Sequence, residues 1–192
     1  WIPLYIALLL LVIKNNESMA QIVIFTSCAI GCVLLSTIAA DFIAKPLVER
    51  WRPSSDPLIK HAVDVVDDYR PGKYGFFSAH AANTFSLALY FSLWVKNRLF
   101  SFAMISWSLL NCYSRIYLGA HYPSDVVVGL LVGAVIAVLF YLLSRKLFFK
   151  ISSNFNYVST QYSATGYSVT DIDMVLTVIG FLYILIIIIP LL

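Results

Sequence analysis

The residues best suited to chemistry lie in one stretch, residues 114–125, which reads S-R-I-Y-L-G-A-H-Y-P-S-D between two apolar runs. Gly119 suits the position just past a helix end, and Pro123 suits the first position of the next helix. His121 is therefore expected in a tight connection between two helices. Asp125 then falls in the first turn of the second helix, where it can hold one ring nitrogen of His121 as a proton donor and leave the other free to attack.

Arg115 ends the first of these two helices and offers a planar guanidinium group suited to phosphate oxygens. The plainer alternative is that His121 and Asp125 only cap helices and form hydrogen bonds. Against this alternative, ionisable groups at the rim of a membrane span are costly and usually functional. Two further polar clusters upstream also favour a catalytic role.

The first upstream cluster, residues 45–53, reads K-P-L-V-E-R-W-R-P. Lys45 and Arg52 are seven residues apart, so a helix here would present both on one face and one anion could touch both. The alternative is that Lys45, Arg50 and Arg52 are interfacial residues whose charged ends extend to lipid headgroups.

The second upstream cluster, residues 76–85, reads F-F-S-A-H-A-A-N-T-F at the start of an apolar run. A helix start carries unpaired N–H groups and partial positive charge, so Ser78, Ala79 and His80 could bind a phosphate without a metal. The alternatives are that Ser78 is a helix N-cap, that Asn83 makes an interior polar contact, and that His80 is structural.

The composition identifies a membrane protein. Of the 192 residues 60% are hydrophobic and 12% are charged, and the mean hydropathy is +0.85, whereas soluble domains average about 25% charged residues. The net charge of +3 is small and the basic residues form no stripe, which argues against nucleic-acid binding. Three cysteines lie inside apolar runs and are expected to be small core or lipid-facing residues: Cys28, Cys32 and Cys112.

The apolar runs predict an all-α helix bundle with six transmembrane helices in a single membrane domain, residues 1–192. The first run is short of the roughly 20 residues that a span needs, and the chain begins without methionine at Trp1, so we expect this span to be truncated at its N-terminus. The glycines 129 and 133 are four apart and allow close helix contact. The expected spans are residues 1–13, 22–44, 76–95, 99–118, 124–143 and 174–192.

A run of acidic residues, D-V-V-D-D, suggests a magnesium site as one possibility. The sequence has no second carboxylate cluster that could complete such a site, so a solvated acidic face is the preferred interpretation. It consists of Asp64, Asp67 and Asp68. We therefore expect no metal and no cofactor.

The order of the spans places the basic residues of the connecting loops on two opposite faces of the membrane. One face holds six Lys and Arg residues, and segment 45–78 on the other face also holds six, so the count alone gives no orientation. Two of the second six, Lys45 and Arg52, are expected ligands. We therefore expect the first face to be cytoplasmic and the active site to be extracytoplasmic. The first face carries Lys14, Lys96, Arg98, Arg145, Lys146 and Lys150.

The three clusters together resemble the signature of the type 2 phosphatidic acid phosphatase superfamily of membrane lipid phosphatases. The first family element, K-x6-R-P, is matched by Lys45, Arg52 and Pro53. The third, S-R-x5-H-x3-D, is matched by Ser114, Arg115, His121 and Asp125. The second is P-S-G-H in the family and here reads Phe77, Ser78, Ala79, His80, which keeps the serine and the histidine.

The resemblance implies a metal-independent phosphohydrolase. His121, oriented by Asp125, would attack phosphorus and form a phosphohistidine, and His80 would protonate the leaving oxygen and then help activate water. The phosphate oxygens would be held by Lys45, Arg52, Ser78 and Arg115 with backbone donors near Ala79.

The resemblance is to bacterial members, which implies an inner-membrane enzyme acting on a membrane lipid phosphate. Three substrates remain open: a polyprenyl diphosphate carrier such as undecaprenyl diphosphate, a phosphorylated glycolipid such as lipid A, and a glycerophospholipid phosphate. The alternative from another class is a non-enzymatic protein that binds or transports a lipid headgroup on the same scaffold. Both histidines and Asp125 are present, which favours the enzyme.

Overall fold

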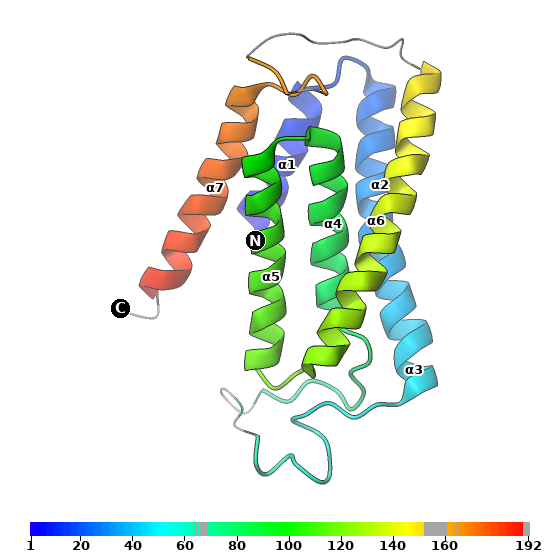
Figure 1. The fold of residues 1–192 in the computed structure, drawn as a ribbon, viewed down its shortest axis with the longest axis vertical. Helices are drawn as coiled ribbons and strands as arrows, with labels where there is room; N and C mark the ends of the chain where they lie inside the picture. Colours follow the sequence, from blue (N-terminus) through cyan, green and yellow to red (C-terminus); the bar gives the residue numbers. More distant parts are fainter. Residues whose placement is uncertain (64, 66–68, 152–160, 164, 190–192) are drawn as a thin grey trace.

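The computed structural model describes residues 1–63, 65, 69–151, 161–163 and 165–189. In these residues every regular element is a helix, which confirms the all-α class. The elements are α1 (Ile2–Lys14), α2 (Met19–Thr37), η1 (Ile38–Ala44), α3 (Lys45–Val48), α4 (Ala79–Val95), α5 (Arg98–Tyr117), α6 (Pro123–Ile151) and α7 (Val169–Ile188). Because α2, η1 and α3 follow one another without a break, the described chain forms six rods in an upright bundle (Figure 1).

Three of the rods are long and apolar enough to cross a membrane: Met19–Val48, Pro123–Lys150 and Val169–Ile188. They identify an integral membrane protein. The helix Ile2–Lys14 is apolar but shorter. Six spanning helices therefore remain a prediction, because α4 and α5 are not among the three.

Helix α4 is the central element of the bundle. Twelve of its 17 residues are buried, and it packs against α2, α5 and α6. Its polar side chains pair with those of neighbouring helices, as where the Oγ1 of Thr84 lies 3.0 Å from the Oγ of Ser108 on α5. Asn83 Nδ2 donates to Thr37 Oγ1 on α2 at 2.9 Å, as expected of an interior polar contact. Such internal pairing lets a helix inside the bundle carry polar residues that lipid would not tolerate.

Two glycines of α6 bring this helix against the start of α4. A Cβ atom on Gly129 would lie 2.7 Å from the carbonyl oxygen of Ser78, and one on Gly133 would lie 2.7 Å from that of Ala82. Neither distance is possible for a larger residue without a backbone shift. The expected close helix contact is therefore confirmed, and it sets the first turns of α4 and α6 side by side.

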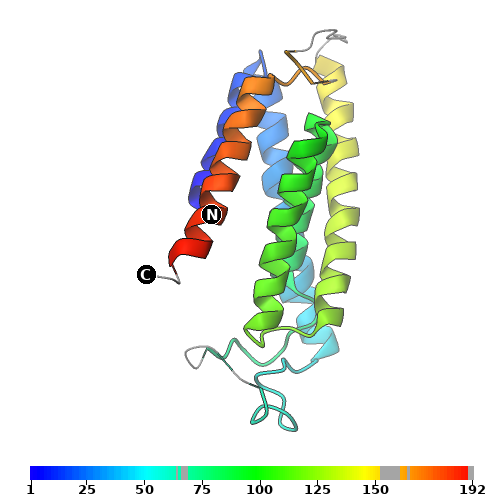
Figure 2. The same cartoon turned by 60° about the vertical axis from the view of Figure 1, so that its left-hand side comes forward.

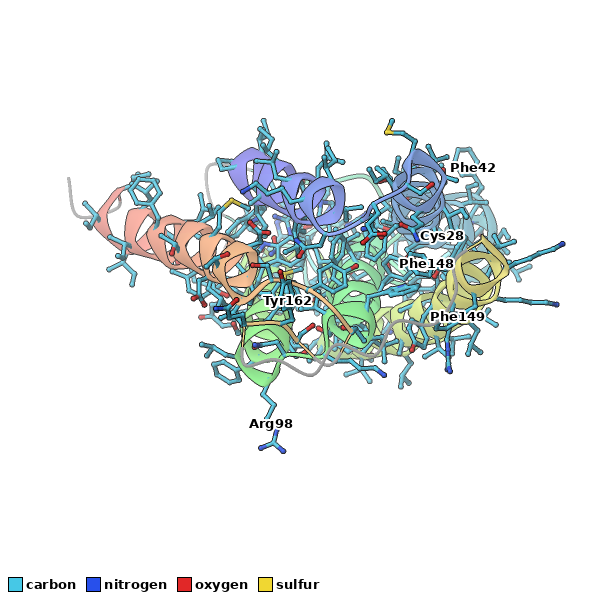
Figure 3. The ribbon with its side chains drawn as sticks, turned by 90° about the horizontal axis from the view of Figure 1, so that it is seen from above. Cys28, Phe42, Arg98, Phe148, Phe149 and Tyr162 are labelled. Carbon is cyan, nitrogen blue, oxygen red and sulfur yellow. The ribbon has the colours of Figure 1, made fainter. Side chains whose placement is uncertain are left out.

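The connections gather at two opposite ends of the bundle. The described residues of segment 49–78, together with residues 118–122, form the lower end in Figure 1, below the starts of α4 and α6. The turns after α1 and α4 lie at the opposite end, where Arg98 extends away from the bundle (Figure 3). Lys14 pairs there with Asp171 of α7 at 3.1 Å. Helix α7 packs against α1 and α5 and lies beside α1 in Figure 2.

Several predicted boundaries differ from the helix ends, by eight residues at the end of α6 and by fewer elsewhere. Helix α6 runs past residue 143, α7 begins before residue 174, and α4 begins after Ser78, whose side chain caps it. The residues of the candidate magnesium site, Asp64, Asp67 and Asp68, lie outside the described residues. The three cysteines are buried and free, as expected.

Candidate active site

The connection that carries His121 has the predicted local structure. Helix α5 ends at Tyr117, Gly119 adopts a φ of +60°, and α6 begins at Pro123. A side chain at residue 119 would be strained in this conformation, and its Cβ would also approach Val63 to 2.9 Å. The turn therefore fixes His121 between two helix ends, in a buried position.

The contacts of His121 define its tautomer. The Nη1 of Arg52 lies 3.1 Å from its Nε2. Because a guanidinium group has donors only, Nε2 must accept this hydrogen bond, and the neutral ring then carries its proton on Nδ1. Nδ1 lies 3.8 Å from the Oδ2 of Asp125. Asp125 is thus close enough to stabilise a positive charge on the ring, although the two atoms are too far apart for a hydrogen bond.

The electrostatic environment keeps His121 neutral. Burial lowers the pKa of His121, and the charge of Arg52 lowers it further, while Asp125 raises it in part. The lone pair on Nε2 is therefore present at neutral pH. A neutral imidazole with this lone pair is the form that can attack phosphorus.

Asp125 is fully buried and is held by two groups besides His121. Its Oδ1 accepts from Arg50 Nη1 at 2.7 Å, and its Oδ2 accepts from the backbone N–H of Tyr122 at 3.0 Å. Its own carbonyl oxygen accepts from the N–H of Ser78 at 3.1 Å. The aspartate therefore links the histidine connection to the start of α4.

The prediction that Lys45 and Arg52 share one face of a helix was wrong. Helix α3 ends at Val48 because Glu49 adopts a left-handed conformation, with φ +48° and ψ +30°. Arg52 also precedes a proline, and this disfavours a helical conformation at Arg52. Its backbone N–H instead donates to the carbonyl of Lys73 at 2.9 Å in an extended pairing of two loop segments.

This extended segment aims Arg52 at the histidine. Its Nε donates to the carbonyl of Tyr74 at 3.0 Å, and its Nη1 donates to that of Ala120 at 3.1 Å. Gly75 makes room for it, since a Cβ there would lie 2.9 Å from Arg52 Cγ and 3.5 Å from His121 Nδ1. Backbone carbonyls therefore hold the guanidinium group in place while its charge has no carboxylate partner in the described structure.

Lys45 lies at the end of the α2–η1–α3 rod and pairs with Asp41 one turn earlier. It is close enough to act electrostatically on both His80 and His121. Arg115 at the end of α5 also acts on His80. The tertiary structure thus brings all three predicted cationic ligands near the two histidines, though Lys45 and Arg52 arrive from different segments.

Arg115 has the longest polar contact of these three cations. Its Nε donates to the Oγ of Ser114 at 3.4 Å, and no carboxylate pairs with it in the part of the chain that the structure describes. Its side chain is half-buried at the last turn of α5. A guanidinium group in this state is free to bind an added anion.

The start of α4 has the helix cap that was the alternative role given for Ser78. The Oγ of Ser78 accepts from the N–H of Ala81 at 3.4 Å, and Ser78 is fully buried. Within the described residues the amides of Ala79 and His80 have no hydrogen-bond partner, as expected for the first turn of a helix. Ser78 therefore acts as an N-cap, and the two free amides are the donors left for an anion.

Two residues of the site were not predicted from the sequence. Arg50 was interpreted only as an interfacial residue, and Gly75 was not considered. A usable signal existed for Arg50, because residues two apart in an extended segment lie on the same side, and Arg52 was already a candidate. For Gly75 the sequence offers no comparable signal.

Among the described residues no group of three or more His, Cys, Asp or Glu side chains is close enough to hold a metal ion. The side chains that meet here are instead two histidines, one buried carboxylate and several cations. This set suits the binding of a phosphate group and attack on it by a ring nitrogen.

The fold and the site define an integral membrane helix bundle with a histidine, aspartate and arginine centre at one end. The family model described as the PAP2 superfamily matches residues 24–149, and the chain belongs to this superfamily. This confirms the family that the three motifs predicted and the phosphatase class of enzyme that goes with it.

Named relatives are lipid phosphatases. The chain is 34% identical over 155 residues to the lipid A 4'-phosphatase of Bacteroides thetaiotaomicron, a match that covers 80% of this chain and 68% of that protein. It is 35% identical over 140 residues to the lipid A 4'-phosphatase of Porphyromonas gingivalis, covering 71% of this chain and 57% of that protein. It is 34% identical over 90 residues to the undecaprenyl-diphosphatase BcrC of Bacillus subtilis, covering 47% and 41%. No solved structure matches the chain.

Proposed function

We propose that this protein is a lipid phosphatase that cleaves a phosphate from a membrane lipid through a phosphohistidine at His121. The observation that carries the proposal is the geometry of this ring. Its Nε2 faces the guanidinium group of Arg52 at 3.1 Å, while its Nδ1 faces the buried carboxylate of Asp125 at 3.8 Å. A phosphate bound by Arg52 would thus meet the lone pair of the ring.

In the first step Nε2 of His121 forms a bond to phosphorus as the bond from phosphorus to the lipid oxygen breaks. His80 donates a proton to that oxygen, so the lipid leaves as a neutral alcohol, or as a monophosphate from a diphosphate substrate. The ring becomes positive, and Asp125 stabilises this charge. Arg52, Arg115 and Lys45 balance the negative charge on the phosphoryl oxygens.

In the second step a water molecule attacks phosphorus and the bond to His121 Nε2 breaks. His80, now neutral, takes a proton from this water, and inorganic phosphate is released. The free amides of Ala79 and His80 at the start of α4 remain donors to the oxygens in both steps. Every proton and bond is accounted for by side chains of this chain and by water.

A cavity that begins at His80 supports a lipid substrate. It has a volume of about 550 Å³ and lies among α1, α2, α4 and α5. Its polar side chains near the site are His80, Asn83 and Thr84, and most of the rest of its lining is apolar. This volume lies within the range of about 300–1,000 Å³ for small-molecule pockets, so it can hold part of an apolar chain while the phosphate stays at the histidines.

The proposed first substrate is a phosphorylated glycolipid of the lipid A type. Both longest matches among the named relatives are lipid A 4'-phosphatases. A polyprenyl diphosphate is the second candidate, supported by the shorter match to an undecaprenyl-diphosphatase. A phosphatidic acid type lipid is the third, on the grounds of the shared phosphate chemistry.

The proposed location is the bacterial inner membrane with the active site facing the extracytoplasmic side. The loops that carry the site lie at one end of the bundle (Figure 1). The opposite end carries the basic residues of the turn after α4 and of the last turns of α6. The Lys and Arg counts of the two faces are equal, so this orientation rests on assigning Lys45 and Arg52 to phosphate binding.

The test is a panel assay of the purified protein in detergent against lipid A, undecaprenyl diphosphate and phosphatidic acid, with release of inorganic phosphate as the readout. We expect the highest kcat/KM for lipid A. Failure to release phosphate from all three lipids would overturn the proposed activity, and a clear preference for another lipid would overturn only the first choice of substrate.

A His121→Ala variant tests the nucleophile in the same assay. We expect no phosphate release and no acid-labile phosphoenzyme after a rapid quench with radiolabelled substrate, because no other ring nitrogen replaces Nε2. The matched control is His61→Ala, which removes an exposed histidine from the same end of the molecule and should leave turnover unchanged. Turnover of His121→Ala near that of the unaltered protein would contradict the mechanism.

A further inference from the structure

Arg50 makes a set of contacts that the family motif does not explain. Its Nη1 donates to the Oδ1 of Asp125 at 2.7 Å and to the Oγ of Ser124 at 2.9 Å. Its guanidinium carbon lies 4.5 Å from the centre of the Tyr122 ring. Its backbone carbonyl also accepts from the N–H of Gly75 at 2.9 Å. Arg50 is thereby held at the start of α6 by its side chain and beside Gly75 by its backbone.

The arginines at positions 50 and 52 face different groups. Arg52 bonds to backbone carbonyls and to the nucleophilic side of His121, and it has no carboxylate partner in the described structure. Arg50 forms an ion pair with the fully buried Asp125. Arg50 contacts the carboxylate and not the imidazole, so its direct link to the catalytic pair is through Asp125.

We propose that Arg50 is a positioning residue that holds the carboxylate of Asp125 in the orientation that His121 needs, an inference that rests on the proposed phosphatase function. The two oxygens of Asp125 have separate partners. Oδ1 is occupied by Arg50, and Oδ2 is left between the N–H of Tyr122 and the Nδ1 of His121. Without Arg50, Oδ1 loses its ion-pair partner and the carboxylate is held by the N–H of Tyr122 at Oδ2 alone.

Arg50 also balances the buried negative charge. With Arg50 present, Asp125 is neutralised by a full positive charge at 2.7 Å, so it attracts a proton on His121 less strongly. Without Arg50 the imidazole becomes the nearest group that can compensate Asp125. The ring would then be protonated at a higher pH, and the protonated ring lacks the lone pair that attacks phosphorus.

The other charged groups around His121 are unchanged by this substitution. Arg52 faces Nε2 and Lys45 acts on the ring from α3, and both disfavour a positive charge on His121 with or without Arg50. His80 on α4 is the other titratable group coupled to the ring. A change on removing Arg50 therefore reports on Asp125.

The kinetic test compares Arg50→Gln with Arg50→Lys and with the control Lys73→Gln. Lys73 is an exposed cation of the neighbouring loop segment, 6.0 Å from the ring centre of Trp51. For Arg50→Gln we expect kcat to fall about 10- to 100-fold, the range for losing a hydrogen bond to a charged group, with KM within about threefold. Arg50→Lys should recover part of kcat, since it keeps the charge but not the planar guanidinium group that lies over the Tyr122 ring. Lys73→Gln should change neither constant.

The second readout is the titration of His121, followed by NMR of histidine-labelled protein in micelles. The chain has three histidines, so single substitutions assign their signals. We expect His121 to titrate at a higher pH in Arg50→Gln than in the unaltered protein. In an Asp125→Asn background the same substitution should shift neither the titration nor kcat further, because its effect passes through Asp125.

The outcomes separate the two claims. If the unaltered protein releases phosphate from none of the lipids, the proposed function fails, and the histidine titration still decides the role of Arg50. If Arg50→Gln raises KM and leaves kcat unchanged, Arg50 binds substrate and the positioning role is wrong. If it changes neither kinetics nor titration, or if its effect persists in Asp125→Asn, the role is also wrong. If Arg50→Gln does not fold, Arg50→Lys decides by the same criteria.

Discussion

Replacement of Asp125 by asparagine tests the pair on which the proposed mechanism depends. The change keeps the size of the side chain and removes its charge. The amide of asparagine can also present an N–H to the ring and favour the tautomer that carries its proton on Nε2, which cannot attack. Arg50 would lose its partner, but 37% of its side chain is exposed and water can solvate its charge. The variant should therefore remain folded.

The expected size of the effect follows from the distance between the two groups. A positive charge that forms on His121 lies 3.8 Å from Asp125, and at an effective dielectric constant of ~20 this attraction is about 4 kcal/mol. Each ~1.4 kcal/mol is a factor of about ten in rate, so kcat should fall about 10³-fold. The same change beside the histidine of serine proteases costs about 10⁴-fold, with a shorter hydrogen-bonded contact.

The assay is steady-state phosphate release over a range of lipid concentrations in mixed micelles. We expect kcat to fall and KM to change little, because Arg52, Arg115 and Lys45 still bind the phosphate. Asp171→Asn is the control, since this residue pairs with Lys14 at the opposite end of the bundle. A raised KM with unchanged kcat would show that Asp125 serves binding or folding, and the pairing of His121 with Asp125 would be refuted.

Two further predictions concern metal and pH. Activity should survive EDTA and be inhibited by vanadate, which mimics five-coordinate phosphorus; complete loss on chelation that magnesium restores would revive the acidic run D-V-V-D-D as a metal site. Burial lowers the pKa of His121, so the ring keeps its lone pair to a pH below the usual value of about 6.5 and the acid limb of kcat/KM should lie below that pH. As pH falls through the lowered pKa, the ring takes a proton and the rate drops. An acid limb above the usual value would show that Asp125 outweighs burial.

Much of the local structure around the site is determined by neighbouring residues in the sequence. Gly119 and Pro123 mark the end of one helix and the start of the next, as predicted, and Ser78 caps α4, which was the alternative role given for it. These features depend on residues within one helical turn of each other, so composition and spacing are enough to predict them. The membrane class follows from composition for a similar reason, because lipid selects apolar runs whatever their order.

The contacts between clusters could not be predicted in this way. Arg52 reaches His121 across 69 residues, and Arg50 reaches Asp125 across 75. Both depend on Glu49 ending α3, so that segment 50–52 leaves the helix and pairs with segment 73–75. The helix predicted for these residues would have placed Lys45 and Arg52 on one face, and that prediction was wrong.

The sequence by itself determined which groups are available for chemistry: two histidines, a carboxylate and several cations, in the order of the PAP2 superfamily. Only the tertiary structure decided which of them meet. The physical reason is that a side chain's type and its local helix are set by a few adjacent residues, whereas its partner is set by packing. In this protein the close contact of α6 with α4 at Gly129 places Asp125 beside Ser78. The paired loop segments bring Arg50 to Asp125 and Arg52 to His121.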